Sequence, residues 1–205
     1  MQLYAHLYEQ TLQQGDYFDP PQGQTAIWVK SGALSDGVKH WIAGDGFYST
    51  SLSMTSTSPS STVLCFNFHV SANGLHSGKT LLKSKCNWPD ITCILRLDSV
   101  TFPKDAIAYR HVHAGAGIRY LIRGGLEIKS DHGADYMKNG NAWFEDANSP
   151  VKATASATQS SQFIRAMLLP VEYEGKPTIK FLNPEDIDKP KEQTNHRFFD
   201  QRVTL

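Results

Sequence analysis

The chain has 205 residues, of which 40% are hydrophobic, and this suits one or two compact domains with an ordinary core. Lys plus Arg and Asp plus Glu number 20 each, so the formal net charge is zero and no bulk field attracts nucleic acid or an anionic membrane surface. The start of the chain has no basic stretch leading into an apolar run, and no segment has the roughly 18 apolar residues of a membrane span. We therefore expect a cytoplasmic protein with neither nucleic acid nor a membrane as a partner.

Short stretches of apolar, β-branched and aromatic residues alternate along the chain with clusters of Gly, Asp, Asn and Pro. This pattern predicts β-strands at residues 63–70, 92–97, 118–122 and 162–169. No stretch sustains a helical apolar period for long enough to form a core helix. Residues 183–186 combine a capping Asn with a Pro and two acids, which predicts one surface turn of helix. The predicted fold class is therefore all-β with little helix.

The chain contains an internal repeat of about a hundred residues, a length that suits two duplicated β-domains. Residues 28–32 match residues 120–124, and both read as an aromatic-led apolar strand that ends in a Gly turn. Residues 44–48 match residues 140–144, and both lead from a Gly into aromatic residues. The sequence is therefore predicted to encode one antiparallel β-fold twice.

The repeat predicts a division of the chain into four parts. Residues 1–72 form the N-terminal half, residues 73–91 connect the halves, and residues 92–171 form the C-terminal half. Residues 172–205 form a tail that is charged and contains Pro but ends in apolar residues. We expect the tail to pack on the C-terminal half or on a partner subunit.

The second copy contains two histidines separated by one residue, His111 and His113, followed by Gly117 and by the Gly-led turn at residues 140–144. This arrangement resembles the two sequence motifs of the cupin family, and the repeat extends the resemblance weakly over residues 10–70. The chain is similar to a small bicupin with a degenerate metal motif. The resemblance implies two antiparallel β-barrels or jelly rolls, a site in a barrel mouth, and a homodimer.

Two positions that bind metal in the cupin family have changed in this chain. Gly117 stands where the resemblance places a Glu, and Val151 stands where it places a third His. The corresponding positions of the first copy hold Asp19, Pro21, Thr25 and Thr55. We therefore expect a structural N-terminal barrel without ligand histidines, and we expect Gly117→Glu to strengthen divalent-metal binding in the C-terminal barrel.

The remaining residues of the motif predict a pocket for an anion. Alternate residues of a strand face the same side, so Tyr109, His111 and His113 are predicted to share one wall, and Arg119 is predicted to face inward from the next strand. An Arg in a cavity of low dielectric repels a divalent cation and attracts a carboxylate or phosphate. Arg119 has an alternative role, which is a structural salt bridge with Glu127.

A metal site is the alternative interpretation of the same histidines. His111 and His113, with Glu145 or Glu127 as a third ligand, would hold one divalent transition metal such as Fe, Mn, Ni or Zn. The sequence thus leaves three functions open. The first is a cupin that binds a small organic anion, with isomerase-like or lyase-like chemistry by a His as an option. The second is a metal-dependent dioxygenase or lyase, and the third is a non-enzymatic ligand sensor or scaffold.

Overall fold

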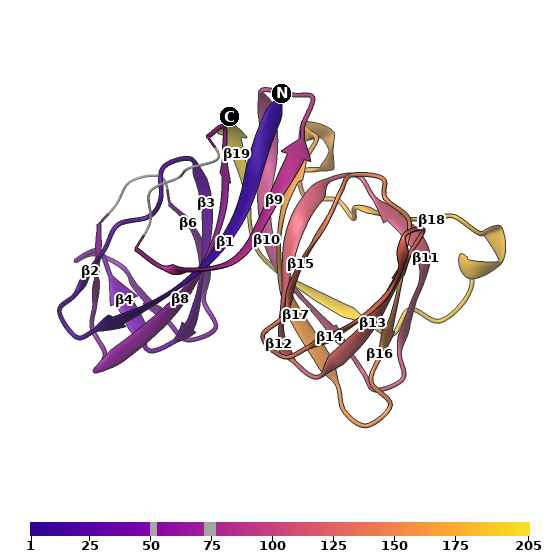
Figure 1. Cartoon of the computed structure of the whole chain (residues 1–205), viewed down its shortest axis with the longest axis horizontal. Coiled ribbons are helices and arrows are strands. Elements are labelled where there is room, and N and C mark those ends of the chain that lie inside the picture. The colour runs from indigo at the N-terminus through magenta and orange to yellow at the C-terminus, as the bar shows by residue number, and fades with distance from the viewer. Residues whose placement is uncertain (50–52, 72–76) are drawn as a thin grey trace.

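The alternating apolar segments form strands that build two β-barrels lying side by side (Figure 1). The computed structural model describes residues 1–49, 53–71 and 77–205. Within these residues the helical structure consists of two 3-10 turns, Val171–Tyr173 (η1) and Pro184–Asp186 (η2). The second turn lies in the predicted segment 183–186, and the prediction of an all-β fold is confirmed. None of the described segments is a helix that could cross a membrane.

The N-terminal barrel consists of two antiparallel sheets with the strand orders β6-β3-β8-β1-β9 and β2-β7-β4-β5. Its strands are β1 (Gln2–Gln13), β2 (Tyr17–Phe18), β3 (Gln24–Ser31), β4 (Ala33–Ser35), β5 (His40–Ile42), β6 (Gly46–Ser49), β7 (Met54–Ser56), β8 (Ser60–His69) and β9 (Lys79–Asn87). Its interior is filled by apolar side chains such as Phe18, Ile27 and Met54.

The C-terminal barrel also has two antiparallel sheets, with the strand orders β15-β12-β17-β10-β19 and β14-β13-β16-β11-β18. Its strands are β10 (Thr92–Phe102), β11 (Ile107–His113), β12 (Ala116–Arg123), β13 (Gly125–Ser130), β14 (Gly133–Lys138), β15 (Ala142–Glu145), β16 (Val151–Ala155), β17 (Ser161–Leu169), β18 (Ile179–Phe181) and β19 (Thr194–Thr204). The order β6-β3-β8-β1 recurs as β15-β12-β17-β10, and β2-β7-β4-β5 recurs as β11-β16-β13-β14. The sequence repeat is therefore a duplication of one barrel topology.

The repeated glycine turn explains part of the sequence match. Gly32 and Gly124 have positive φ angles of 75° and 81°, which side chains other than glycine rarely adopt. A Cβ atom at either position would lie 2.4 Å from a backbone carbonyl oxygen, that of Ser60 in one barrel and that of Ser160 in the other. Both barrels thus require glycine here for the same two reasons.

The largest buried apolar cluster joins the two barrels. Leu7, Trp28 and Phe66 of the N-terminal barrel belong to the same cluster as Tyr120 and Leu168 of the C-terminal barrel. Burial of apolar area between two sheets is the main stabilising contribution available to such a pair. The contact fixes the sheet that contains β3 and β8 against the sheet that contains β12 and β17, and it leaves the second sheet of the C-terminal barrel to close that barrel's interior.

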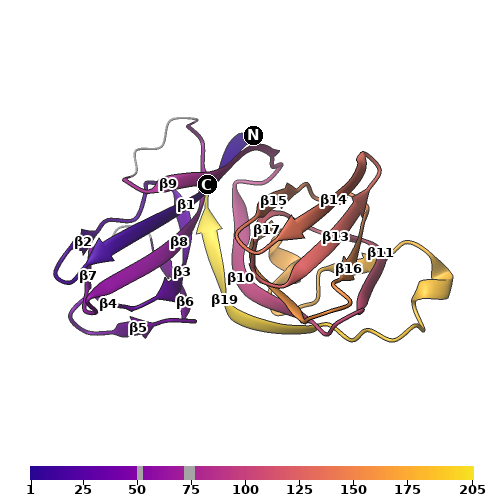
Figure 2. The same ribbon diagram turned by 60° about the horizontal axis from the view of Figure 1, so that its bottom comes forward.

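Two segments between and after the predicted halves form edge strands. Residues 79–87, within the predicted connector 73–91, form β9, which pairs with β1; residues 73–76 of that connector lie outside the described part of the chain. The tail provides β18, which pairs with β11, and β19, which pairs with β10 and lies between the barrels (Figure 2). The tail thus packs on the C-terminal barrel of its own chain.

Candidate ligand-binding site

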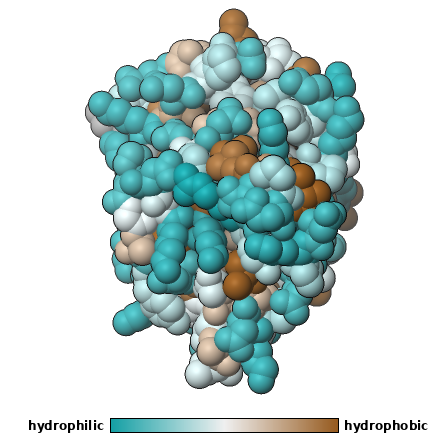
Figure 3. Space-filling view, turned by 90° about the vertical axis from the view of Figure 1, so that its right-hand side faces the viewer, coloured by the Kyte–Doolittle hydropathy of each residue, from teal (hydrophilic) through white to brown (hydrophobic). Residues whose placement is uncertain are grey.

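A cavity of about 340 Å³ lies inside the C-terminal barrel, between its two sheets and the tail. The tail segment that leads from η1 to β19 contributes Thr178, Phe181 and Gln193 to the wall. Figure 3 shows this side of the molecule, where hydrophobic atoms appear within a frame of hydrophilic residues. A cavity of this kind in a barrel is the usual place for a small ligand.

The histidine pair lies in the wall of this cavity. His111 and His113 project from β11 and are almost fully buried, and their Nε2 atoms are 3.1 Å apart. Tyr109, predicted to share this wall, does not line the cavity; Ala108 does. The reason is a register irregularity between Ala108 and His111, which breaks the alternation of the strand. The ring of Tyr109 instead lies under the Lys189 ammonium group, at 4.7 Å.

Hydrogen bonds determine which nitrogen of each imidazole is free to accept. The Nδ1 atom of His111 donates to the Tyr109 carbonyl oxygen at 2.6 Å, so the neutral ring has its lone pair on Nε2. The Nε2 atom of His113 accepts from Arg165 at 3.3 Å, and its Nδ1 atom is 3.2 Å from the Thr178 hydroxyl. The His111 Nε2 lone pair therefore faces His113 Nε2 across 3.1 Å, whereas the His113 Nε2 lone pair is already occupied by Arg165.

Both histidines are predominantly neutral in this environment. Burial lowers the pKa of His111 from its usual 6.5, against opposing contributions from the Tyr109 carbonyl and Glu145. Burial and the nearby Arg165 hold the pKa of His113 well below its usual value. Neutral imidazoles with free lone pairs can accept a proton from a ligand or a hydrogen bond from its hydroxyl group.

Arg119 faces the cavity as predicted for an inward residue, but its ion-pair partner is Glu145 and not Glu127. The Arg119 Nη1 atom donates to the Gly117 carbonyl oxygen at 2.6 Å. Its Nη2 atom lies 2.8 Å from Glu145 Oε2 without hydrogen-bond alignment, so Nη2 is buried with no hydrogen-bond acceptor. Burial lowers the pKa of Arg119 to about 10, which leaves the guanidinium charged at pH 7. Glu127 lies on a half-exposed surface, 3.0 Å from Lys129.

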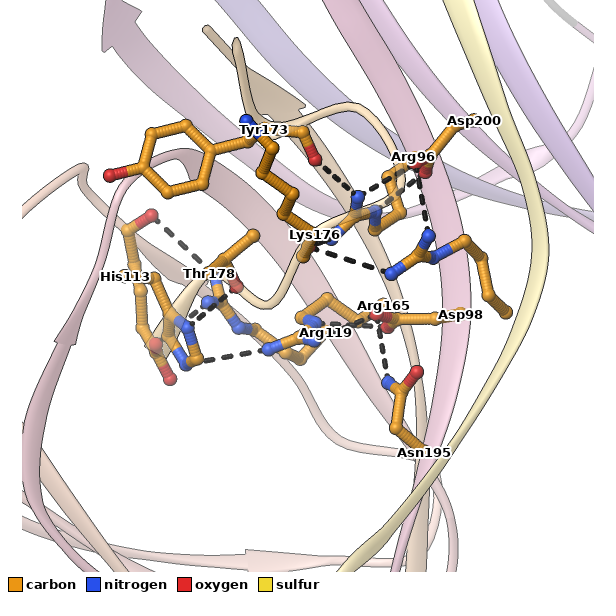
Figure 4. A network of polar contacts seen from close by, with 12 residues as sticks. Arg96, Asp98, His113, Arg119, Arg165, Tyr173, Lys176, Thr178, Asn195 and Asp200 are labelled. Carbon is orange, nitrogen blue, oxygen red and sulfur yellow. Dashed lines mark hydrogen bonds and ion pairs between the residues drawn. The ribbon is translucent and has the colours of Figure 1, made fainter. Parts of the chain in front are cut away.

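A buried ion pair that the sequence analysis missed forms the neighbouring part of the wall. Arg165 donates two hydrogen bonds to Asp98, of 2.9 Å and 2.7 Å, and Asn195 donates a third at 2.9 Å. Figure 4 shows Arg165 between Asp98 and His113. A charged residue in an otherwise apolar strand was the available signal, because such a residue must be paired when its strand is buried.

A second missed ion pair attaches the tail to the barrel. Arg96 donates two hydrogen bonds to Asp200, of 2.6 Å and 2.7 Å, and one each to the carbonyl oxygens of Tyr173 and Lys176, of 2.9 Å and 2.8 Å (Figure 4). Bidentate pairs of this kind combine charge with fixed geometry. Arg96 therefore positions the tail segment that closes the cavity.

The histidines have a spacing that suits a shared metal ion, but the other ligands are missing. Two nitrogens 3.1 Å apart fit adjacent positions on an ion with bonds of about 2.1 Å. Glu145, the remaining candidate ligand, is held by Arg119 and by the Trp143 indole N–H at 2.8 Å. The described residues contain no group of three His, Cys, Asp or Glu side chains placed to hold a metal. A site with three protein ligands does not fit these residues.

Position 117 cannot supply the missing carboxylate. A Cβ atom on Gly117 would lie 2.2 Å from the carbonyl oxygen of Ala166, so any side chain here forces the backbone to move. Gly117→Glu is therefore expected to strain β12 against β17, and its effect on metal binding stays a prediction. Val151, at the position of the family's third His, lies in the cavity wall opposite His111.

No protein-family model matches the sequence, and no curated protein sequence matches it. Its fold is similar to solved structures across both barrels. The oxalate decarboxylase of Lactobacillus farciminis, solved as a formate complex, aligns with a TM-score of 0.61 and 10% identity over 90% of this chain and 82% of that one. The chain has the two-barrel cupin fold. AerE from Microcystis aeruginosa aligns with this chain at a TM-score of 0.58 and 17% identity, over 80% of this chain and 88% of that one.

A putative glyoxylate-induced protein from Pseudomonas aeruginosa also aligns with the bicupin, at a TM-score of 0.58 and 13% identity over 80% of this chain and 74% of that one. Identities this low show the fold alone. The predicted duplication of an antiparallel β-barrel is confirmed by these alignments and by the strand orders. The fold alone assigns no activity to this chain.

Proposed function

We propose that the C-terminal barrel of this bicupin binds a small organic anion whose carboxylate contacts Arg119. The observation that carries the proposal is the buried Arg119 guanidinium in the cavity wall, whose Nη2 atom forms an ion pair with Glu145 at 2.8 Å but no aligned hydrogen bond. The ion pair offsets much of the cost of burying the charge, and an N–H group of Nη2 stays available to an acceptor. A bound carboxylate would accept a hydrogen bond from it.

The charges around the cavity support an anionic ligand. The cationic side chains that line it are Arg96, Arg119, Arg165, Lys191 and Arg197. The carboxylates that line it are those of Asp98 and Glu145, and Asp200 neutralises Arg96 from behind. Positive groups therefore outnumber negative groups, and with neutral histidines the site attracts negative charge.

The histidine pair gives the bound anion a route to acid-base chemistry. His111 and His113 are both neutral, and His111 has its free lone pair on Nε2 in the wall of the cavity that Arg119 also lines. A neutral imidazole can take a proton from a carbon next to a carboxylate or carbonyl group and return it elsewhere. We therefore propose isomerase-like or lyase-like chemistry as the extension of binding.

Calorimetric titration with acetate and benzoate tests the proposal. The wild-type protein is expected to bind at least one of these acids, and Arg119→Met is expected to weaken binding about ten-fold or more, because a charge-assisted hydrogen bond is lost. Arg123→Met provides a matched control, since Arg123 lies on the same strand but is exposed. Equal affinity of the wild type and Arg119→Met would overturn the proposal.

A second candidate function rests on the 3.1 Å spacing of the histidine Nε2 atoms. In this alternative the pair holds a divalent transition metal, and the carboxylate of the substrate completes the ligand set. Mass-spectrometric metal analysis of the purified protein and of His111→Ala/His113→Ala distinguishes the candidates. About one equivalent of metal, lost in the double variant, would favour the metal-dependent cupin. The homodimer implied by the cupin resemblance stays a prediction.

A further inference from the structure

The cavity changes from charged to apolar along the barrel, and one strand shows the whole change. On β10, the side chains of Arg96, Asp98, Val100 and Phe102 all line the cavity, as alternate residues of a strand do. The first two are charged and the last two are apolar. The C-terminal half of this strand therefore provides a hydrophobic wall.

The neighbouring strand of the same sheet continues this division. Arg165 on β17 lies opposite Asp98, whereas Phe163 lies opposite Val100. The Phe163 ring packs against that of Trp143 in a T-shaped contact, with 5.5 Å between ring centroids. Charged side chains thus form one level of the cavity wall and aromatic side chains form the next.

The second sheet of the barrel is apolar along most of its cavity face. Ala153 on β16 lies opposite both Ala108 on β11 and Ile128 on β13, and all three line the cavity. His111, further along β11, lies between the apolar side chains of Val151 and Phe181. The charged level therefore comes from the first sheet, and the second sheet extends the apolar wall beside the histidines.

The apolar level of the cavity offers few hydrogen-bond partners to a water molecule. Among the side chains named there, the one polar atom is the Trp143 indole N–H, and it already donates to Glu145. A water molecule is stable in a cavity when it has two to four polar partners, and an apolar cavity without them binds hydrocarbon instead. The small alanine side chains at positions 108 and 153 leave this space open.

We propose that the ligand is an amphiphilic monocarboxylic acid with a hydrocarbon body of about one ring. Its carboxylate lies at the charged level with Arg119, and its ring lies between Phe163 and Ala153. The cavity of about 340 Å³ is near the lower limit for small-molecule pockets, which suits a single ring. This inference rests on the proposed function and specifies its ligand.

A ligand series tests the inference by calorimetry and by NMR titration of the full chain. The series contains acetate, propanoate, cyclohexylacetate and 3-phenylpropanoate, with succinate as a hydrophilic diacid and 2-phenylethanol as a ring compound without a carboxylate. We expect roughly four-fold tighter binding of propanoate than of acetate, and roughly 50- to 500-fold tighter binding of 3-phenylpropanoate than of acetate. Succinate and 2-phenylethanol are both expected to bind more weakly than 3-phenylpropanoate.

A larger side chain in the apolar level of the cavity tests where the hydrocarbon ring binds. Ala153→Leu is expected to weaken 3-phenylpropanoate at least ten-fold and to leave acetate within about two-fold, because the added side chain occupies the space of the ring. Ala134→Leu, on the exposed face of β14, is the control. Ala108→Val fills the same space with less added volume and replaces Ala153→Leu if that variant does not fold.

Each failure of the series has a distinct meaning. If acetate or succinate binds as tightly as 3-phenylpropanoate and Arg119→Met abolishes that binding, the amphiphilic ligand is wrong and the anion-binding function stands. If 3-phenylpropanoate and 2-phenylethanol bind equally well to the wild type and to Arg119→Met, the site is a hydrocarbon site and the proposed function is wrong. If no acid binds, both are wrong.

Discussion

The two barrels share a strand order but place opposite chemistry at matching positions. Tyr8 on β1 lies opposite Cys65 on β8, and in the second barrel Asp98 on β10 lies opposite Arg165 on β17. Tyr8 and Cys65 belong to a buried apolar cluster, whereas Asp98 and Arg165 form an ion pair in a cavity wall. The N-terminal barrel shows that this topology folds without internal charge. The topology itself therefore does not require the charges of the C-terminal barrel.

The neighbouring strand and the tail extend the comparison. Ile27 on β3 pairs with Cys65, whereas Arg119 on β12 pairs with Arg165 at the matching position. Residues 170–193 connect β17 to β19 and cover the cavity, while the matching connection of the N-terminal barrel spans residues 70–78, partly outside the described residues. The C-terminal barrel, whose cavity the tail lines, thus also has the longer connection between the two matching strands.

Replacing Asp98 is expected to lower the free energy of unfolding much more than replacing the residue at the matching position of the N-terminal barrel. Asp98→Ala leaves the Arg165 guanidinium buried without its bidentate partner, which is expected to lower the free energy of unfolding by about 3–5 kcal/mol. Tyr8→Phe, at the matching N-terminal position, removes one hydroxyl group and is expected to cost about 1 kcal/mol. Urea titration measures both. Equal losses of unfolding free energy in the two variants would show that removing one member of the charged pair destabilises the protein no more than changing its apolar counterpart.

Replacing both members of the ion pair is expected to recover part of that loss. Asp98→Leu/Arg165→Met gives the C-terminal barrel an apolar pair like that of the N-terminal barrel, and no charge remains uncompensated. We expect this double variant to be more stable than Asp98→Ala by about 2 kcal/mol. Chemical denaturation under identical conditions compares the two, and a double variant no more stable than Asp98→Ala would contradict the comparison.

The histidine pair is expected to make a smaller contribution to the free energy of unfolding, and this contribution depends on pH. Burial lowers the pKa of both histidines, and Arg165 lowers that of His113 further. As the pH falls through about 6.5, the unfolded chain binds protons at these positions before the folded chain does, so stability falls. We expect up to about 1 kcal/mol to be lost between pH 6.5 and 5.5 for His113, whose pKa is lowered more strongly, and less for His111. His111→Gln/His113→Gln should show a flatter unfolding free energy over this interval, and an unchanged slope would argue against neutral buried histidines.

The sequence predicted the fold because the signals were local and repeated. Strand and turn composition, together with the Gly32 and Gly124 turns, occur in both copies and point to one topology. His111 and His113 were found for the same reason, since a pair separated by one residue shares a strand face. These signals need no knowledge of distant contacts.

The parts that the sequence did not predict depend on contacts between distant residues. Asp98 and Arg165 are 67 residues apart, and neither belongs to a sequence motif that predicts contact with the other. A register irregularity removed Tyr109 from the cavity wall, and such irregularities have no reliable sequence signal. The sequence suggested Glu145 as a metal ligand, whereas its ion pair with Arg119 depends on the pairing of β12 with β15, which leaves no sequence signal.

The most direct test of the anion site compares Glu145→Gln with Arg119→Met in calorimetric titrations of 3-phenylpropanoate. Glu145 is an internal carboxylate that shares Arg119 with any ligand, so its neutralisation leaves the guanidinium free for the ligand. The anion site predicts opposite changes, with affinity several-fold higher in Glu145→Gln and about ten-fold or more lower in Arg119→Met. Unchanged affinity in both variants, or weaker binding in Glu145→Gln, would contradict a carboxylate bound at Arg119.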